Sequence, residues 1–363
     1  MLGFVLGFLS ARVIDKMIPN SGNKSLFSGI FKDFFLIAIF IISYLVQIII
    51  HEAGHLIFGL ATGYTFVSFR VGSLTIIKED GKYKFKKYNI PGTAGQCLMM
   101  PPELENDKYP FVIYNFGGVF MNLIASGISI ISLILIKDIK FPLNTILLLF
   151  GLAGIVAALT NGIPFKISGL PNDAYNVKSM LKDDEAKTGF YLQLRVNGLL
   201  SKGIRIKDMD YNLFELKEGA DVSNPLNTGI KLLEYTWYLD NMDFENATRV
   251  MDSLVPHINE LVPLYTYEIN SERIFLELIG ECNKNLIDRL YNKNLKKYIK
   301  ASKFMMSKIR LQMAYEAFYN EDKTKALEYY EKLKDLYDNF PIKGEAEMEL
   351  MLGDWMKERI DES

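Results

Sequence analysis

A pair of histidines four residues apart is the strongest chemical signal in the chain. Residues 51–55 read His-Glu-Ala-Gly-His, and the chain contains only three histidines in all. On an α-helix, residues four apart share one face, so His51 and His55 can bind one metal ion. The carboxylate of Glu52 can then reach a water on that metal and act as a general base. The pattern therefore predicts a hydrolytic Zn²⁺ site.

A zinc ion that performs hydrolysis needs a third protein ligand and one open position. His257 stands beside Pro256 in a polar region, where we expect the exposed end of a helix. A carboxylate must therefore serve as the third ligand. Asp173 is selected by elimination, because it lies just past the third apolar run, on the side where the two histidines emerge. The carboxylates set aside lie in the connections between the apolar runs: Asp80, Glu103, Glu105, Asp107 and Asp138.

Three long apolar runs must position these residues. They cover residues 34–60, 109–136 and 143–160, and the last two contain no charged residue. A helix over 34–60 would be about 40 Å long, which is enough to cross a bilayer. Two histidines and a glutamate in such a span cost several kcal/mol unless they face a polar cavity or a partner, which is typical of a functional site. We expect a membrane-embedded core over 31–185, preceded by an interfacial or re-entrant segment over 1–30.

The segment between the first two runs, residues 64–100, is predicted to be a small β insert. Its residues 74–77 and 82–86 are rich in β-formers, and Asp80-Gly81 suits the tight turn of a hairpin between them. The glycines and prolines from 91 to 102 predict an irregular stretch before the second run. The hairpin either holds an unwound substrate segment as an added strand or anchors its lysines to lipid headgroups.

Charge predicts the orientation of the runs in a cell membrane. The connection over 63–108 carries seven Lys and Arg, whereas the connection after the second run carries two. Positive residues stay in the cytoplasm, so the hairpin and everything beyond about residue 162 are expected on that side. The chain is thus predicted to be a multi-pass membrane protein in contact with the lipid bilayer.

The second half of the chain differs from the first in composition. Residues 1–180 carry a net charge of +5, and the remainder carries −7. Residues 186–363 read as amphipathic helices, and segments 233–254 and 311–333 align at an offset of 79 with a weaker unit near 276–291. Units of roughly 40 residues resemble tetratricopeptide repeats, and an irregular helical bundle is the alternative. We expect a soluble cytoplasmic domain that recruits or presents substrate, or restrains the protease until a cytoplasmic protein partner binds. A bundle that only stabilises the membrane part or dimerises is the alternative.

The overall composition excludes two classes. The near-neutral total of −2 with no basic block excludes a dedicated nucleic-acid binder. The two cysteines, Cys97 and Cys282, lie far apart in unlike segments, so the chain has neither a disulfide framework nor a cysteine-based zinc site. The expected fold is mainly α, with polytopic membrane helices, a small β insert and a soluble repeat-like domain.

Three motifs taken together resemble the site-2 protease family of intramembrane zinc metalloproteases. They are the His51–His55 motif, Gly118-xxx-Asn122 in the second run, and Asn161 to Pro164 followed by Leu170-Pro-Asn-Asp173. The resemblance covers about residues 30–180. It implies that His51, His55 and Asp173 bind zinc and that Glu52 activates water. It also implies that Asn122 contacts the substrate backbone or the developing oxyanion, although an interhelical hydrogen bond by Asn122 is the alternative.

The expected function is therefore a zinc metalloendopeptidase that cuts a peptide bond in or near a transmembrane segment or membrane-associated peptide. A catalytically silent membrane scaffold, whose helical repeats gather cytoplasmic partners, would keep the architecture without needing the full set of site residues. A transporter or channel would also place ionisable groups in the membrane, but three spans and a compact water-activating set favour hydrolysis.

Overall fold

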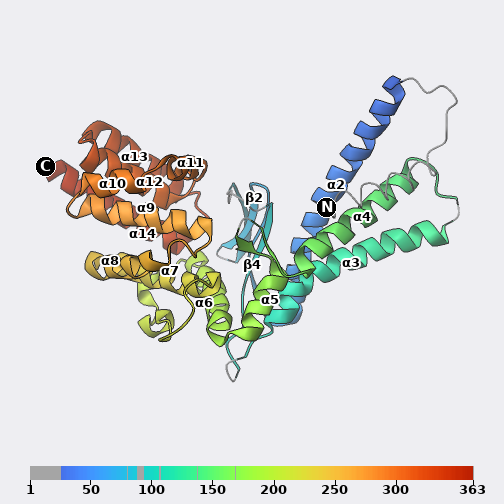
Figure 1. The fold of residues 1–363 in the computed structure, drawn as a ribbon, viewed down its shortest axis with the longest axis horizontal. Coiled ribbons are helices and arrows are strands. Elements are labelled where there is room, and N and C mark those ends of the chain that lie inside the picture. The colour runs from blue at the N-terminus through green and yellow to red at the C-terminus, as the bar shows by residue number, and fades with distance from the viewer. Residues whose placement is uncertain are drawn as a thin grey trace. The chain divides into compact units, whose positions relative to one another are not determined.

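The computed structural model describes residues 26–79, 81–87, 94–105, 108–136, 138–167 and 169–362. The chain is mainly helical and divides into two compact units (Figure 1). The first unit takes Met1–Thr62 and Pro110–Ile163, and the second takes Gly63–Tyr109 and Pro164–Ser363. The expected boundary between 185 and 186 thus runs inside the second unit. The first 25 residues of the expected interfacial segment lie outside the described residues.

The first unit is built from three helices, α2 (Leu26–Ala61), α3 (Phe111–Leu135) and α4 (Leu143–Gly162). Each is long and apolar enough to cross a membrane, as expected for the three runs. Many of their large apolar side chains point outward, among them Phe34, Ile37, Leu45, Leu123, Ile128, Ile134 and Leu143. Polar side chains are buried between the helices, among them Ser43, Gln47, Asn122, Ser126 and Thr145. Apolar surface outside and polar contacts inside are typical of helices that pack within lipid.

The second unit begins with a four-stranded antiparallel sheet. Its strands are β1 (Thr65–Val71), β2 (Leu74–Glu79), β3 (Lys82–Lys87) and β4 (Gly95–Met100), in the order β3-β2-β1-β4. The predicted β insert is confirmed, and Gly81 has the positive φ of 77° that a tight turn requires. The expectation of an irregular stretch was wrong for residues 95–100. They pair with β1 and bury Met99 completely, so pairing outweighs the flanking glycines and prolines.

Helices follow the sheet in the second unit. They are α5 (Asp173–Lys182), α6 (Asp184–Ser201), α7 (Pro225–Asp240), α8 (Phe244–Ser253), α9 (Pro263–Ile279), α10 (Lys284–Leu290), α11 (Lys293–Ala301), α12 (Met306–Ala314), α13 (Lys323–Tyr337) and α14 (Lys343–Glu362). Short helical turns η1 (Ile206–Asp208), η2 (Tyr211–Phe214), η3 (Val255–His257) and η4 (Tyr315–Tyr319) and the two-residue strands β5 (Lys166–Ile167) and β6 (Leu170–Pro171) complete the unit. A large core cluster takes buried residues from every helix from α7 to α14.

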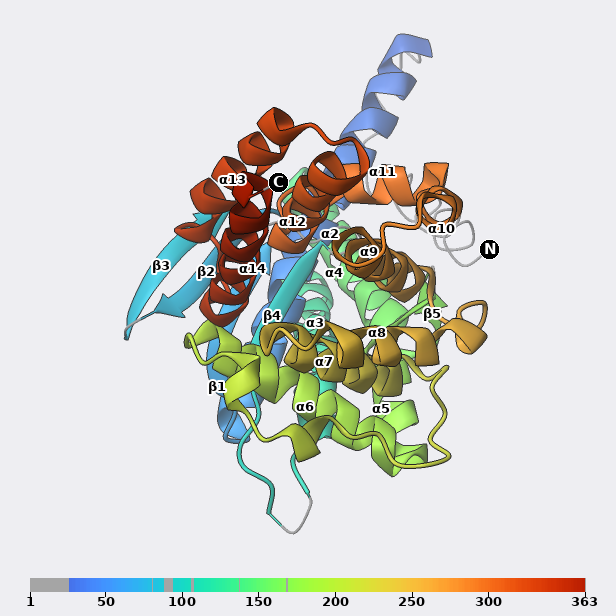
Figure 2. The ribbon, with the colours of Figure 1, turned by 90° about the vertical axis from the view of Figure 1, so that its left-hand side faces the viewer.

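The sheet packs against these helices, and Figure 2 shows its strands beside α6 and α14. The Lys343 ammonium at the start of α14 lies 2.6 Å from the Glu79 carboxylate of β2. The Lys86 ammonium of β3 donates to the Phe340 carbonyl at 2.8 Å. The β insert and the helices that follow residue 186 are therefore parts of one folded unit.

Three turns in this helical part share one backbone conformation. Met242, Cys282 and Glu321, which stand 40 and 39 residues apart, have φ values of 60°, 53° and 57°. Each is followed by a residue whose side chain caps the next helix: Asp243, Asn283 and Asp322. The spacing agrees with units of roughly 40 residues. The tetratricopeptide-like character of these units stays a prediction.

Candidate metal centre

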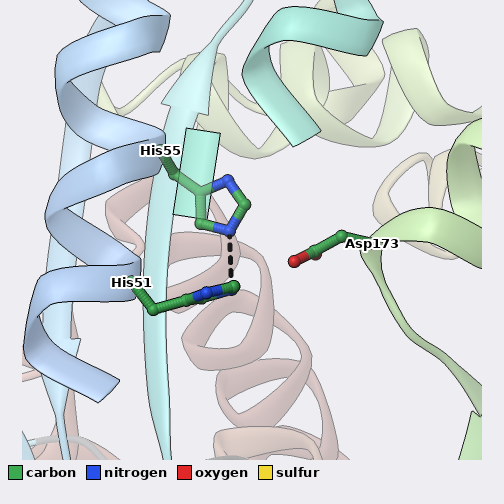
Figure 3. Close-up of side chains that lie close together, drawn as sticks. All are labelled: His51, His55 and Asp173. Carbon is green, nitrogen blue, oxygen red and sulfur yellow. Dashed lines mark hydrogen bonds between the residues drawn. The ribbon is translucent and has the colours of Figure 1, made fainter. Parts of the chain in front are cut away.

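The two histidines of the motif meet edge to face in the interior of the first unit. His51 and His55 lie on one face of α2, with ring centroids 4.8 Å apart at an interplanar angle of 83°. Their side chains are buried, and their Nε2 atoms are 3.2 Å apart (Figure 3). The predicted convergence of the two imidazoles is thus present in the structure.

A chain of hydrogen bonds fixes the tautomer of His51. The Asn122 amide nitrogen donates to the main-chain carbonyl and to Oε1 of Gln47, both at 2.8 Å. This orientation leaves Asn122 Oδ1 to face His51 Nδ1, also at 2.8 Å. Because an amide oxygen only accepts, the Nδ1 of His51 carries the proton and its Nε2 presents a lone pair. The Gln47 amide in turn donates to the Phe150 carbonyl of α4 at 3.2 Å, so all three helices contribute.

His55 has the same tautomer for a different reason. Its Nδ1 lies 2.8 Å from the main-chain carbonyl of Tyr114 in the first turn of α3. A carbonyl oxygen can only accept, so this Nδ1 also carries the proton. The Nε2 lone pairs of His51 and His55 therefore point toward one another at 3.2 Å.

Two facing lone pairs repel each other unless a cation lies between them. For Zn–N bonds of about 2.0–2.1 Å in a tetrahedral site, two nitrogen ligands lie about 3.3 Å apart. The observed separation of 3.2 Å between the Nε2 atoms fits that geometry. Hydrogen bonds from the remote ring nitrogens to oxygen acceptors are what metal-bound histidines usually make. The donor pair in the first unit therefore fits zinc.

Glycines allow α3 to approach α2 closely enough for these bonds. A Cβ on Gly54 would lie 2.3 Å from the Gly117 carbonyl oxygen, and one on Gly118 would lie 2.5 Å from the His51 ring. Neither distance is sterically allowed. Gly54, Gly117 and Gly118 are therefore close-packing positions.

Glu52 is buried next to His51 in α2, and Asp173 is the first residue of α5 in the second unit. The nine residues from Phe165 to Asp173 contain the β5–β6 hairpin, with Gly169 at a φ of 86°. Asn172 caps α5 by accepting from Tyr175 N at 2.9 Å, and its main-chain N donates to the Phe165 carbonyl. The local fold thus holds the aspartate at a helix N-terminus.

The two histidines belong to the first unit and Asp173 to the second, so a role for Asp173 at the metal belongs to the proposal below. His257 belongs to η3 in the second unit, where its side chain is partly exposed and its Nδ1 lies 3.5 Å from the Glu260 carboxylate.

Sequence reasoning missed two groups that orient the histidines. Gln47 carries a signal, since it is a polar residue in an apolar run and stands one turn before His51 on the same helix face. The Tyr114 carbonyl carries none, because every residue has one. The described contacts of Asn122 go to His51 and Gln47, which is the interhelical alternative. Its expected contact with substrate stays a prediction.

Comparison of the chain with protein-family models, with curated proteins and with solved structures gave no match.

Proposed function

We propose that this chain is an intramembrane zinc metalloprotease in which His51 and His55 hold the metal. The observation that carries the proposal is the pair of Nε2 lone pairs facing each other at 3.2 Å, with both Nδ1 atoms engaged by oxygen acceptors. A purely structural polar cluster would instead need a proton shared between the two Nε2 atoms. The arrangement favours a bound cation.

Asp173 is the proposed third ligand. A carboxylate and two neutral imidazoles form a ligand set that zinc accepts while keeping a position open for water. The capping side chain of Asn172 and the β5–β6 hairpin limit the conformations of the segment that carries this aspartate. The ligand set also leaves the overall charge of the centre at +1, which is less costly to bury than a free divalent ion.

Zinc bound there would polarise a peptide carbonyl and make water nucleophilic at neutral pH. Glu52 is the proposed general base. It takes the proton from the attacking water and later delivers it to the leaving amine, so its carboxylate must not be a metal ligand itself. Its neighbour His51 and the hydrogen-bond chain through Asn122 and Gln47 hold the helix face that presents this carboxylate.

The membrane setting follows from the surface of the first unit. Its helices expose apolar side chains and bury polar ones, which is favourable in lipid and unfavourable in water. The sheet and the later helices form one folded unit and therefore occupy one side of the bilayer. The lysines of the sheet assign that side to the cytoplasm, so we propose a multi-pass protein of the cell membrane with a cytoplasmic C-terminal part.

A peptide bond within a helix is shielded, so a transmembrane substrate must unwind before cleavage. β3 is an edge strand of the sheet, and its Tyr83 and Phe85 side chains are exposed. An unwound segment could add to this edge as a further strand, with affinity from main-chain hydrogen bonds. The same strand carries Lys82, Lys84 and Lys86, and attachment to anionic headgroups is the competing role.

Metal analysis combined with peptide mapping tests the proposal. The full-length protein and its Glu52→Gln variant, both purified in detergent, should carry one zinc each, whereas His51→Ala and Asp173→Ala should carry little. Membranes from cells that express the wild type should show new peptide N-termini in or near transmembrane segments, and membranes with Glu52→Gln should lack them. If the wild-type protein contained no zinc, and if cells that express Glu52→Gln behaved like cells that express the wild type, the silent scaffold would be favoured.

A further inference from the structure

A groove on the helical part of the second unit gathers positive charge. It lies between α11 and α13, with α12 beneath, and has a volume of about 640 Å³. Five lysines and one aspartate line it together with apolar and aromatic groups. The lysines are Lys296, Lys300, Lys303, Lys308 and Lys332, and this set is called the lysine groove below.

Four of these lysines have no carboxylate partner among the described residues. Lys308 is buried and lies 2.7 Å from the Glu268 carboxylate, whereas Lys296, Lys300, Lys303 and Lys332 make no ion pair. Elsewhere in the unit, lysines commonly pair with a carboxylate, as Lys231 does with Glu234 and Lys343 with Glu79. The residues from 181 onward carry a net charge of −7. This cluster of lysines without carboxylate partners is therefore a local region of positive charge in an acidic part of the chain. The lysine groove is therefore a region of positive electrostatic potential that attracts anions.

The floor of the groove is apolar and ordered by packing. Ile299 and Ile309 are buried, and the Tyr291 hydroxyl accepts a hydrogen bond from the Gln312 amide at 2.9 Å. The ammonium of Lys296 lies 4.9 Å from the Tyr291 ring centroid, and that of Lys332 lies 4.4 Å from the Tyr329 ring centroid. The cations thus stand over aromatic faces at two edges of an apolar floor.

We propose that the lysine groove binds an acidic peptide segment of a partner protein. The cations come from α11, from the connection after it and from α13, so they match several separated carboxylates better than a single phosphate, which is usually held by donors converging on one point. The apolar floor and the tyrosines offer contacts to the apolar side chains of such a segment. The volume lies within the range of about 300–1,000 Å³ that is typical of ligand sites.

This inference goes beyond the proposed protease activity and does not depend on it, because the lysine groove contains none of the residues proposed for the zinc site. It specifies the chemistry of a partner that the helical part would recruit. Association should be fast and should weaken with salt, since exposed charges dominate it.

The test uses the full-length protein in nanodiscs of uncharged lipid and a fluorescein-labelled dodecapeptide in which Glu alternates with Leu and Tyr. We expect anisotropy to report saturable binding that weakens as salt rises, and no binding of the same peptide with Gln in place of Glu. The double variant Lys296→Glu with Lys300→Glu should weaken binding at least tenfold. The matched control, Lys293→Glu with Lys297→Glu, changes the same helix and the same net charge outside the groove and should stay within twofold.

Three outcomes would overturn the proposal. Equal losses in both double variants would show only a general effect of net charge. Absence of peptide binding, combined with lysine-dependent binding to vesicles containing phosphatidylserine, would assign the groove to lipid. Binding of the Gln peptide as tightly as the Glu peptide would remove charge as the basis of recognition. Equal zinc content and melting temperature in all variants keeps these outcomes separate from misfolding and from failure of the metal centre.

Discussion

At the scale of single residues, the proposed metal centre would depend on side chains that do not touch the metal. Each imidazole has two nitrogens, and only the one without a proton can bind zinc. Asn122 and the Tyr114 carbonyl decide which nitrogen that is, by accepting from Nδ1 of His51 and His55. Gln47 fixes the orientation of Asn122, and its own amide is held by the Phe150 carbonyl.

We therefore predict that Asn122→Leu lowers zinc affinity about 10–100-fold, as is usual when the acceptor behind a metal-bound histidine is lost. Gln47→Leu should cause a smaller loss, since the main-chain carbonyl of Gln47 still accepts from Asn122. Competition with a chelator of known affinity measures both values.

Ser129→Ala is the control for that prediction. It removes a different interhelical hydrogen bond, from the Ser129 hydroxyl of α3 to the Leu147 carbonyl of α4, without touching a histidine. Zinc affinity should be unchanged. If Asn122→Leu also kept full zinc affinity but lost cleavage, Asn122 would act on the substrate instead of on His51.

The pairing of the two proposed metal ligands could be predicted from the sequence more readily than the residues behind them. His51 and His55 stand out because the helical period brings residues four apart to one face. Asn122 stands out by its motif, but its contact with His51 depends on how closely α3 packs against α2. The distance between the two helices is set by tertiary packing at Gly54, Gly117 and Gly118, which no local sequence pattern specifies.

At the scale of elements, the approach of α2 to α3 is the step that assembles the centre. Gly54 and Gly117 stand opposite each other, and a Cβ on either would collide with the main chain of the other helix. Small residues at such crossings let two helix backbones approach and gain van der Waals contact in lipid, where apolar side chains gain little by leaving the solvent.

Gly54→Ala should therefore separate α2 from α3, lower the melting temperature in detergent and abolish zinc binding. Gly127→Ala provides the matched control on α3, because a Cβ at Gly127 would meet nothing within 4 Å. That substitution should leave zinc content unchanged and leave the melting temperature equal or slightly higher, since alanine favours helix. Normal zinc content in Gly54→Ala would mean that the close contact is not needed for the site.

The sheet shows where local patterns were insufficient at this scale. The hairpin of β2 and β3 was predictable from alternating β-formers around Gly81. β4 was not, because glycine and proline residues flank it and its strand conformation depends on pairing with β1, as between Phe69 and Cys97. A contact between segments almost thirty residues apart leaves no signal in a short window of sequence.

At the scale of the whole molecule, the second unit joins the sheet to helices far along the chain and contains a buried polar seam. Arg310 lies 2.6 Å from Glu349 and 2.7 Å from Glu272, and all three are buried. Glu345 stands one turn before Glu349 on α14. Burial, followed by the charges of Glu349 and Glu268, raises the pKa of Glu345 to about 8, against the lowering effect of Lys308.

This shift predicts a pH dependence of stability. Between its ordinary pKa of 4.5 and about 8, Glu345 holds a proton in the folded protein that it has lost in the unfolded chain. Stability should therefore fall as pH rises through that window and level off above about 8. Glu345→Gln, which cannot ionise, should flatten this part of the profile and raise the melting temperature at pH 8.5 relative to the wild type.

Glu358→Gln, on the exposed face of the same helix, is the control and should leave the profile unchanged. Melting temperatures of the full-length protein from pH 5 to 9 measure all three proteins. A wild-type profile that rises through the window, or a Glu345→Gln profile parallel to that of the wild type, would contradict the assignment.

The interleaving of the two units also governs how the molecule is made. The ribosome produces the sheet before α3 and α4, yet the partners of the sheet, α6 and the start of α14, emerge much later. At about 5–20 residues per second, that interval is on the order of tens of seconds. During it, β3 and β4 leave their outer edges unpaired, and such edges invite pairing with other chains. The lysines of β3 then repel a second copy of the same strand, so a feature of the finished surface also protects the nascent chain.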